Sequence, residues 1–212
     1  IKVLWKEIAA ANEEGDNYKC KILYYKTSRI LFILSVLISG AVLPWSLEIV
    51  TLLLGDEYKN GAFVLVIMLI YPIHQSLGQI NGTMYFALEM TRSYVIINSV
   101  QMVVSIIVVY FLLAPSDAIV SGLNLGSLGL AIKMVSIQII SVNVSIWWLA
   151  RAKNWDYSLW YQIYNIILFL LIGYAISALT NTVMDDSVAV LTRMSIGVII
   201  YMVICIFLIQ KY

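Results

Sequence analysis

The stretch Gly61–Leu88 reads GAFVLVIMLIYPIHQSLGQINGTMYFAL and contains no Asp, Glu, Lys or Arg. About 20 apolar residues in a helix cross the roughly 30 Å hydrocarbon core of a bilayer, so this stretch is long enough to span a membrane. Its second half nevertheless carries amides, hydroxyls and His74, the single histidine of the chain. We therefore expect a membrane-spanning helix with one polar side.

The composition of the whole chain agrees with a membrane protein. Hydrophobic residues make up 62% of it and charged residues 12%, whereas soluble domains average about 45–50% and about 25%. The net charge is +1, which gives no reason to expect binding to nucleic acid. The predicted fold class is an all-α integral membrane protein.

Apolar runs predict six transmembrane helices, at residues 30–54, 61–88, 93–114, 126–150, 158–180 and 190–210. Short connections should make neighbouring helices antiparallel. Pro44 is expected to bend the first helix. Pro72 should loosen the second, because proline has no N–H to donate to the carbonyl of Met68.

We divide the chain into three regions. Residues 1–29 mix acids, bases and apolar side chains and are predicted to form a cytoplasmic amphipathic elbow on the membrane surface; a solvated loop is the alternative. Residues 30–150 would form four helices and residues 151–212 two more. The chain begins without methionine, in polar sequence, so a fragment of a longer protein is expected, with a natural half-length protein as the alternative.

Basic residues predict the orientation, since they favour the cytoplasmic side of a membrane. With residues 1–29 inside, ten of the 13 Lys and Arg residues lie on the cytoplasmic side. The outer turns then hold acidic residues: Asp56, Glu57, Asp117, Asp185 and Asp186. Both ends of the segment should be cytoplasmic.

On a helix at about 100° per residue, the polar side of residues 71–94 groups His74 and Asn81, with Gln75 and Gln79 beside them. The opposite side is apolar and compatible with lipid: Ile73, Leu77, Ile80, Met84 and Ala87. Because unsatisfied polar groups are costly in hydrocarbon, the polar side should line a hydrophilic cavity or form hydrogen bonds between helices.

Further polar residues lie at mid-depth in the third and fourth helices. Asn98, Gln101 and Asn143 are amides, and Lys133 is a base about 10 Å inside the fourth helix at 1.5 Å per residue. An intramembrane base suggests a site for an anion, although Lys133 is also within reach of the outer interface. The candidate substrate-binding residues are therefore His74, Gln75, Gln79, Asn81, Asn98, Gln101, Lys133 and Asn143.

No motif indicates catalysis. The sequence has no GxxxxGK[ST], HExxH, CxxC or GxSxG, and its spans contain no acidic pair. Cys20 and Cys205 follow no metal or redox spacing. We therefore predict no enzyme activity, no catalytic residue, no cofactor and no metal site.

Four segments carry a family resemblance: EEGDNYKCKILYYKTSR (13–29), LPWSLEIVTLLLGDEYKNGAFVLVIMLI (43–70), IHQSLGQINGTMYFALEMTRSYVIINSV (73–100) and GLNLGSLGLAIKMVSIQ (122–138). In this order, over about residues 10–155, the chain resembles the C-terminal half of polysaccharide (O-antigen, Wzx-type) flippases. These proteins belong to the MOP superfamily, together with the MATE exporters.

The resemblance implies the C-terminal lobe of a MATE-like transporter, with helices nine to fourteen of fourteen and the last two as additions. It implies movement of a polyprenyl-pyrophosphate-linked oligosaccharide across the bacterial inner (plasma) membrane by alternating access, in lipopolysaccharide and other surface polysaccharide biosynthesis. The partners would be the bilayer, the N-terminal lobe of the same protein and, as a candidate, the polysaccharide polymerase machinery. The amides and His74 would contact sugar hydroxyls, and Lys133 the anionic head.

Three alternatives stay open. A MATE-type small-molecule or cation antiporter would need an ion-binding carboxylate, which these spans lack. A membrane-embedded glycan-processing enzyme would change the mass of its lipid-linked substrate, whereas a flippase relocates it. A lobe without activity of its own is the third. The sequence indicates neither the sugar, nor the coupling ion, nor the organism.

Overall fold

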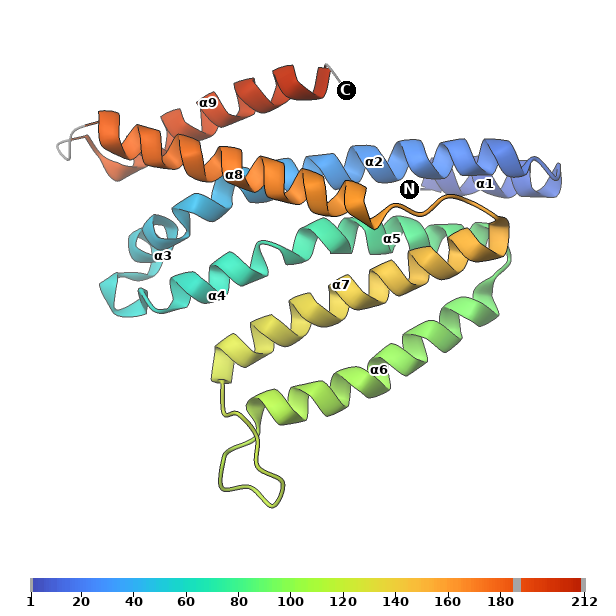
Figure 1. Cartoon of the computed structure of the whole chain (residues 1–212), viewed down its shortest axis with the longest axis horizontal. Coiled ribbons are helices and arrows are strands. Elements are labelled where there is room, and N and C mark those ends of the chain that lie inside the picture. Colours follow the sequence, from blue (N-terminus) through green and yellow to red (C-terminus); the bar gives the residue numbers. More distant parts are fainter. Residues whose placement is uncertain (1, 185–187, 211–212) are drawn as a thin grey trace. The chain divides into compact units, whose positions relative to one another are not determined.

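The computed structural model describes residues 2–184 and 188–210, and all regular structure in these ranges is helical (Figure 1). The other residues, which include the predicted outer acids Asp185 and Asp186 and both chain ends, lie outside the described part. Six helical stretches are long and apolar enough to span a membrane: Asn17–Leu54, Gly61–Ala87, Thr91–Leu113, Gly126–Lys153, Leu159–Val183 and Val190–Gln210. The predicted all-α, multi-pass membrane protein is therefore confirmed.

The first spanning stretch begins earlier than predicted. Helix α1 (Lys2–Glu13) is followed by a turn, and α2 (Asn17–Val42) then continues without interruption. Gly15 takes a φ of +73° in the turn, and the Asp16 carboxylate accepts the backbone N–H of Lys19 at 2.9 Å, a helix N-cap. Residues 2–29 thus form α1, a turn and the first turns of α2.

Pro44 and Pro72 each lie at a break in a helix, in agreement with the prediction that they disturb the helices. At Pro44 the chain passes through a 3-10 turn, η1 (Leu43–Trp45), into α3 (Ser46–Leu54). After η2 (Asp56–Tyr58), helix α4 (Gly61–Met68) ends before Pro72, and α5 (Tyr71–Ala87) begins anew. The Ser39 hydroxyl donates to the backbone carbonyl of Leu69 at 2.7 Å, which satisfies an acceptor at the second break.

The remaining helices are α6 (Thr91–Leu113), α7 (Gly126–Lys153), α8 (Leu159–Val183) and α9 (Val190–Gln210). The chain forms two compact units. Unit 1 contains Ile1–Phe32 and Tyr71–Leu159, and unit 2 contains Ile33–Ile70 and Trp160–Tyr212. In unit 2, glycines allow close helix packing: a Cβ on Gly197 of α9 would lie 2.6 Å from Cζ2 of Trp45.

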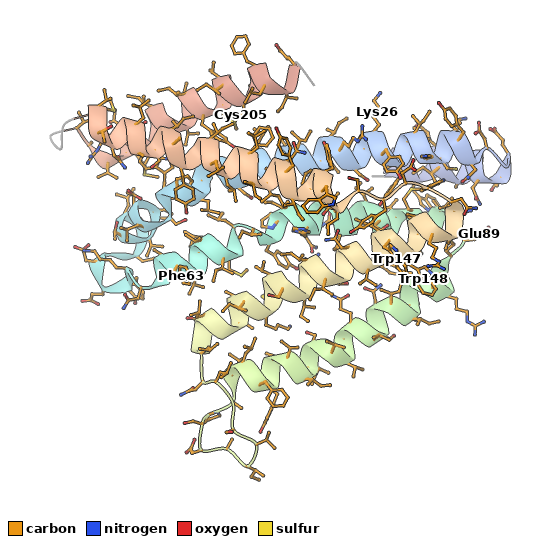
Figure 2. All side chains as sticks on the ribbon, viewed as in Figure 1. Lys26, Phe63, Glu89, Trp147, Trp148 and Cys205 are labelled. Atoms are coloured by element: carbon orange, nitrogen blue, oxygen red, sulfur yellow. The ribbon has the colours of Figure 1, made fainter. Side chains whose placement is uncertain are left out.

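In unit 1, α7 packs against both α5 and α6, and α1 packs against α5 (Figure 1). The core of this unit includes residues from α1, α2, α5 and α7 and from the segments directly after α5 and α7: Ile8, Ala11, Cys20, Tyr24, Ile80, Met84, Tyr85, Ala87, Leu88, Leu149, Ala150 and Trp155. Figure 2 shows Trp147 and Trp148 near the C-terminal end of α7, where a membrane interface favours aromatic side chains.

The apolar side of α5, which the sequence shows only as compatible with lipid, packs against protein. Its five apolar residues, Ile73, Leu77, Ile80, Met84 and Ala87, are all buried in the protein. Ile80, Met84 and Ala87 belong to the core of unit 1, because α1 and the start of α2 cover this side of α5. Helix α6 differs from α5 in burial, since it contributes no buried residue. Its apolar side chains are suited to face lipid.

Candidate functional site

A polar pocket lies inside unit 1, between α5, α6 and α7, and has a volume of about 220 Å³. We call it the amide pocket, because its lining is dominated by amide and hydroxyl side chains: Gln75, Gly78, Gln79, Asn81, Tyr94, Ile97, Asn98, Gln101, Gln138, Ser141, Val142 and Ser145. Among these described residues none is Asp, Glu, Lys, Arg or His. A pocket within three membrane-spanning helices is therefore polar without carrying a formal charge.

Helix α5 supplies one wall, because residues three and four apart share a side of a helix. Gln75, Gly78 and Gln79 follow this spacing, with Asn81 deeper in the pocket. Gly78 permits the close approach of α7: a Cβ there would lie 3.0 Å from Cγ2 of Val142 and 3.3 Å from Nε2 of Gln138.

Helix α7 supplies the opposite wall through Gln138, Ser141 and Ser145, at positions i, i+3 and i+7. The Gln138 side-chain amide donates to Oε1 of Gln75 on α5 at 2.7 Å. The Ser141 hydroxyl donates to Oε1 of Gln101 on α6. Since an amide has two donor hydrogens and an acceptor oxygen, these bonds between helices leave further donors and acceptors for a ligand.

The floor of the pocket is Asn81, of which only 1% is exposed. Its amide nitrogen donates to the Ser145 hydroxyl at 2.6 Å, and its amide oxygen accepts the Tyr24 hydroxyl at 3.4 Å. The Tyr85 hydroxyl donates to the backbone carbonyl of Ser145 at 2.8 Å. This network fixes the Asn81 side chain and connects the pocket to the core of unit 1.

The rim of the pocket is more exposed and consists of Gln79, Asn98 and Tyr94. The Asn98 amide donates to the backbone carbonyl of Tyr94 at 2.7 Å, and Gln79 makes no side-chain hydrogen bond within the described residues. A hollow of about 290 Å³ adjoins this rim, shares Gln79 and Tyr94 with the pocket, and extends to Phe86. The ring centroids of Tyr94 and Phe86 are 5.2 Å apart, so an aromatic surface lies beside the amides.

Five of the eight candidate residues come together in this pocket: Gln75, Gln79, Asn81, Asn98 and Gln101. The other three lie outside its lining. His74 is buried, and its Nδ1 has no hydrogen-bond partner within the described residues. Asn143 donates to the backbone carbonyl of Ile139 and accepts the Tyr157 hydroxyl, each at 2.9 Å.

Lys133 is half-buried on another side of α7. At about 100° per residue it lies roughly 120° around the helix from Ser145, so it does not contribute a charge to the amide pocket. Four polar lining residues were not among the sequence-based candidates: Tyr94, Gln138, Ser141 and Ser145. The spacing of Gln138, Ser141 and Ser145 on one side of α7 is the signal that would have identified three of them.

The amide pocket offers hydrogen-bond donors and acceptors without a formal charge, because amides and hydroxyls both donate and accept, and this chemistry suits an uncharged, hydroxyl-rich ligand. Among the described residues, no group of three or more His, Cys, Asp or Glu side chains is placed to hold a metal ion. Fold and pocket together define a class: an all-helical, multi-pass membrane protein with an uncharged polar pocket inside its helical bundle.

Comparison of the chain with known protein families, with curated proteins and with solved structures finds no match.

Proposed function

We propose that the chain is the C-terminal part of a flippase for lipid-linked oligosaccharides in the plasma membrane of a bacterium. It would move a polyprenyl-pyrophosphate-linked repeat unit to the outer leaflet by alternating access, for surface polysaccharide biosynthesis. The six spanning helices would then be the C-terminal lobe of a MATE-like transporter, with α8 and α9 as its two additional helices. The resemblance of about residues 10–155 to O-antigen flippases motivates this proposal.

The observation that carries the proposal is the amide pocket. A sugar presents hydroxyl groups that donate and accept hydrogen bonds, and such a ligand crosses hydrocarbon only if protein groups replace its water. Gln79, Asn98 and Gln101 line a cavity of about 220 Å³ at membrane-spanning helices. This volume is below the roughly 300–1,000 Å³ typical of pockets for drug-sized ligands, so it would hold one sugar residue of a longer chain.

The experiment compares two asparagines with the same local bond. The Asn98 amide donates to the carbonyl four residues earlier at 2.7 Å, and Asn165 of α8 does the same at 2.7 Å. Asn98 lines the amide pocket and Asn165 does not. We expect N98L combined with Q79L to lower surface polysaccharide about tenfold, because each lost hydrogen bond costs about 0.5–1.5 kcal/mol, while N165L should leave it unchanged.

The variants are made in the complete natural protein and expressed in cells that lack it, and membrane levels of each variant are measured by immunoblot. In the double variant, lipid-linked oligosaccharide of unchanged mass should accumulate in the inner leaflet. Equal polysaccharide export by the double variant and by N165L would contradict the site. A change in the mass of the lipid-linked oligosaccharide would indicate an enzyme, and loss of drug efflux with normal glycan would indicate an antiporter.

A further inference from the structure

The hollow of about 290 Å³ beside the amide pocket has an aromatic lining of its own. We call it the aromatic hollow, and it is lined by Gly78, Gln79, Gly82, Thr83, Phe86 and Tyr94. Its residues from α5 recur at intervals of three and four positions and therefore share one side of the helix. Because Gly78, Gln79 and Tyr94 line both cavities, the aromatic hollow and the amide pocket are adjoining parts of one site.

The Tyr94 ring is held in place by its neighbours. Its centroid lies 5.5 Å from that of Tyr85, which is fully buried, and 5.2 Å from that of Phe86. Gly82 leaves room for this ring, since a Cβ there would lie 3.1 Å from Oη of Tyr94. The Phe86 ring is 51% exposed. The hollow therefore presents a half-exposed aromatic ring beside a fixed one.

Two polar groups next to these rings have no partner within the described residues. Side-chain donors reach only the backbone carbonyls of Gln79 and Tyr94, from Thr83 and Asn98, so the Gln79 amide and the Tyr94 hydroxyl are both unpaired there. Such groups in membrane-spanning helices are costly unless water or a ligand satisfies them. A lipid chain would cover the rings but leave both polar groups unsatisfied, whereas a ligand with C–H and O–H groups satisfies all of them.

A pyranose ring has both kinds of surface. Its C–H groups form an apolar patch on the face of the ring, and its hydroxyls project from the edge. The C–H hydrogens carry a small positive partial charge and the face of an aromatic ring is negative, so the two stack. With one face on Phe86, the hydroxyls of a sugar would point to the unpaired groups of Gln79 and Tyr94.

Neither cavity compensates an ionised group. The described residues that line the aromatic hollow and the amide pocket include no Lys or Arg. Moving an ionised carboxylate from water into such a site costs far more than moving a hydroxyl, because no cation replaces its hydration. The site therefore favours a neutral sugar over an acidic sugar of the same size.

We propose that the aromatic hollow and the amide pocket bind an uncharged hexopyranose of the lipid-linked oligosaccharide and exclude an acidic one. The sugar stacks on Phe86 and bonds to Gln79 and Tyr94. This inference rests on the proposed function and names the class of sugar that its site accepts. The hollow lies where α5 ends and α6 begins, which is the cytoplasmic side in the predicted orientation and the side from which a flippase substrate enters.

The test measures the binding of synthetic lipids to the complete natural protein in nanodiscs. Three polyprenyl pyrophosphates with a short chain serve as probes: one carries glucose, one glucuronic acid and one no sugar. Glucose and glucuronic acid differ only in that a carboxylate replaces the CH₂OH group. We expect the glucose probe to bind at least about tenfold more tightly than each of the other two.

The variant F86L tests the stacking, because leucine keeps an apolar side chain but removes the ring. We expect it to weaken binding of the glucose probe by about three- to tenfold, the usual effect of losing one aromatic contact. The matched control is F63L. Phe63 of α4 is 60% exposed and lines neither cavity (it is labelled in Figure 2), so F63L should bind the glucose probe as the unaltered protein does.

The variant Q79K tests the exclusion of charge, because it places a cation on the wall that both cavities share. We expect it to strengthen binding of the glucuronic acid probe at least about fivefold through a charge-assisted hydrogen bond. Q79M is the control, since its side chain is of similar length and uncharged, and it should give no such gain.

Equal affinity for glucose and glucuronic acid would overturn this inference and leave the proposed function standing. Equal effects of F86L and F63L would overturn the stacking, and equal affinity for the sugar-free probe would overturn sugar recognition at this site. Binding of none of the three probes would contradict both this inference and the proposed function. Circular dichroism of each variant checks that its helices are intact.

Discussion

Gly78 is a position where a single side chain would separate two walls of the amide pocket. A Cβ there already lies 3.0 Å from Val142, so the larger side chain in G78V would displace α7 and lengthen the Gln75–Gln138 hydrogen bond. We expect a loss of about 1–3 kcal/mol of stability, the usual effect of overpacking, measured by thermal unfolding in detergent. The control is G61V, since a Cβ on Gly61 meets nothing within 4 Å; equal losses would contradict this packing.

Among the elements, the break between α4 and α5 depends on a contact from α2. Ser39 is 1% exposed, and its hydroxyl donates to the Leu69 carbonyl. We expect S39A to lower the free energy of unfolding by about 1–2 kcal/mol, because a buried acceptor loses its partner. The exposed Ser195 donates to the Leu191 carbonyl within its own helix, so S195A should change stability by less than about 0.5 kcal/mol. Chemical denaturation in detergent measures both, and equal effects would refute the role of Ser39.

For the whole molecule, the distribution of charge predicts its direction in the membrane. Arg92 lies at the start of the spanning stretch Thr91–Leu113 and Asp117 lies beyond its other end. Both residues are exposed. Because basic residues favour the cytoplasmic side, a cysteine in R92C should react with an impermeant thiol reagent only from inside, and one in D117C only from outside. Labelling with reversed sidedness would refute the predicted orientation, and labelling of both from one side would refute the span.

At this scale, much of the fold is predictable from the sequence. Uninterrupted apolar runs require spanning helices, and Pro44 and Pro72 interrupt them for reasons that do not depend on tertiary structure. Whether the apolar side of a helix faces lipid or the protein core is not predictable from the sequence in the same way. Lipid and protein core are equally apolar, so Ile80 and Met84 satisfy the sequence pattern in either environment; only the packing of α1 against α5 buries them.

The residues of the candidate site also divide into those that the sequence indicates and those that only the packing of the helices reveals. The amides of α5 and α6 were candidates because an amide inside a spanning helix needs a partner. Ser141 and Ser145 are weaker indications of a polar site, since a serine in a helix can bond to its own backbone. They line the pocket only because Ser141 faces Gln101 and Ser145 faces Asn81. Lys133 was a candidate because of its charge, but its position around α7 separates it from the amide pocket.

The lining of the amide pocket consists of two kinds of residue, and this division has a consequence for how binding preference changes during evolution. Asn81 and Ser145 are bonded to each other, so replacing either also disturbs the core. Gln79 and Asn98 hold no other helix in place, and their exchange leaves the bundle intact. For the proposed binding function, substitutions at the rim can therefore change the preference for a ligand, while the residues of the floor preserve the capacity of the chain to fold.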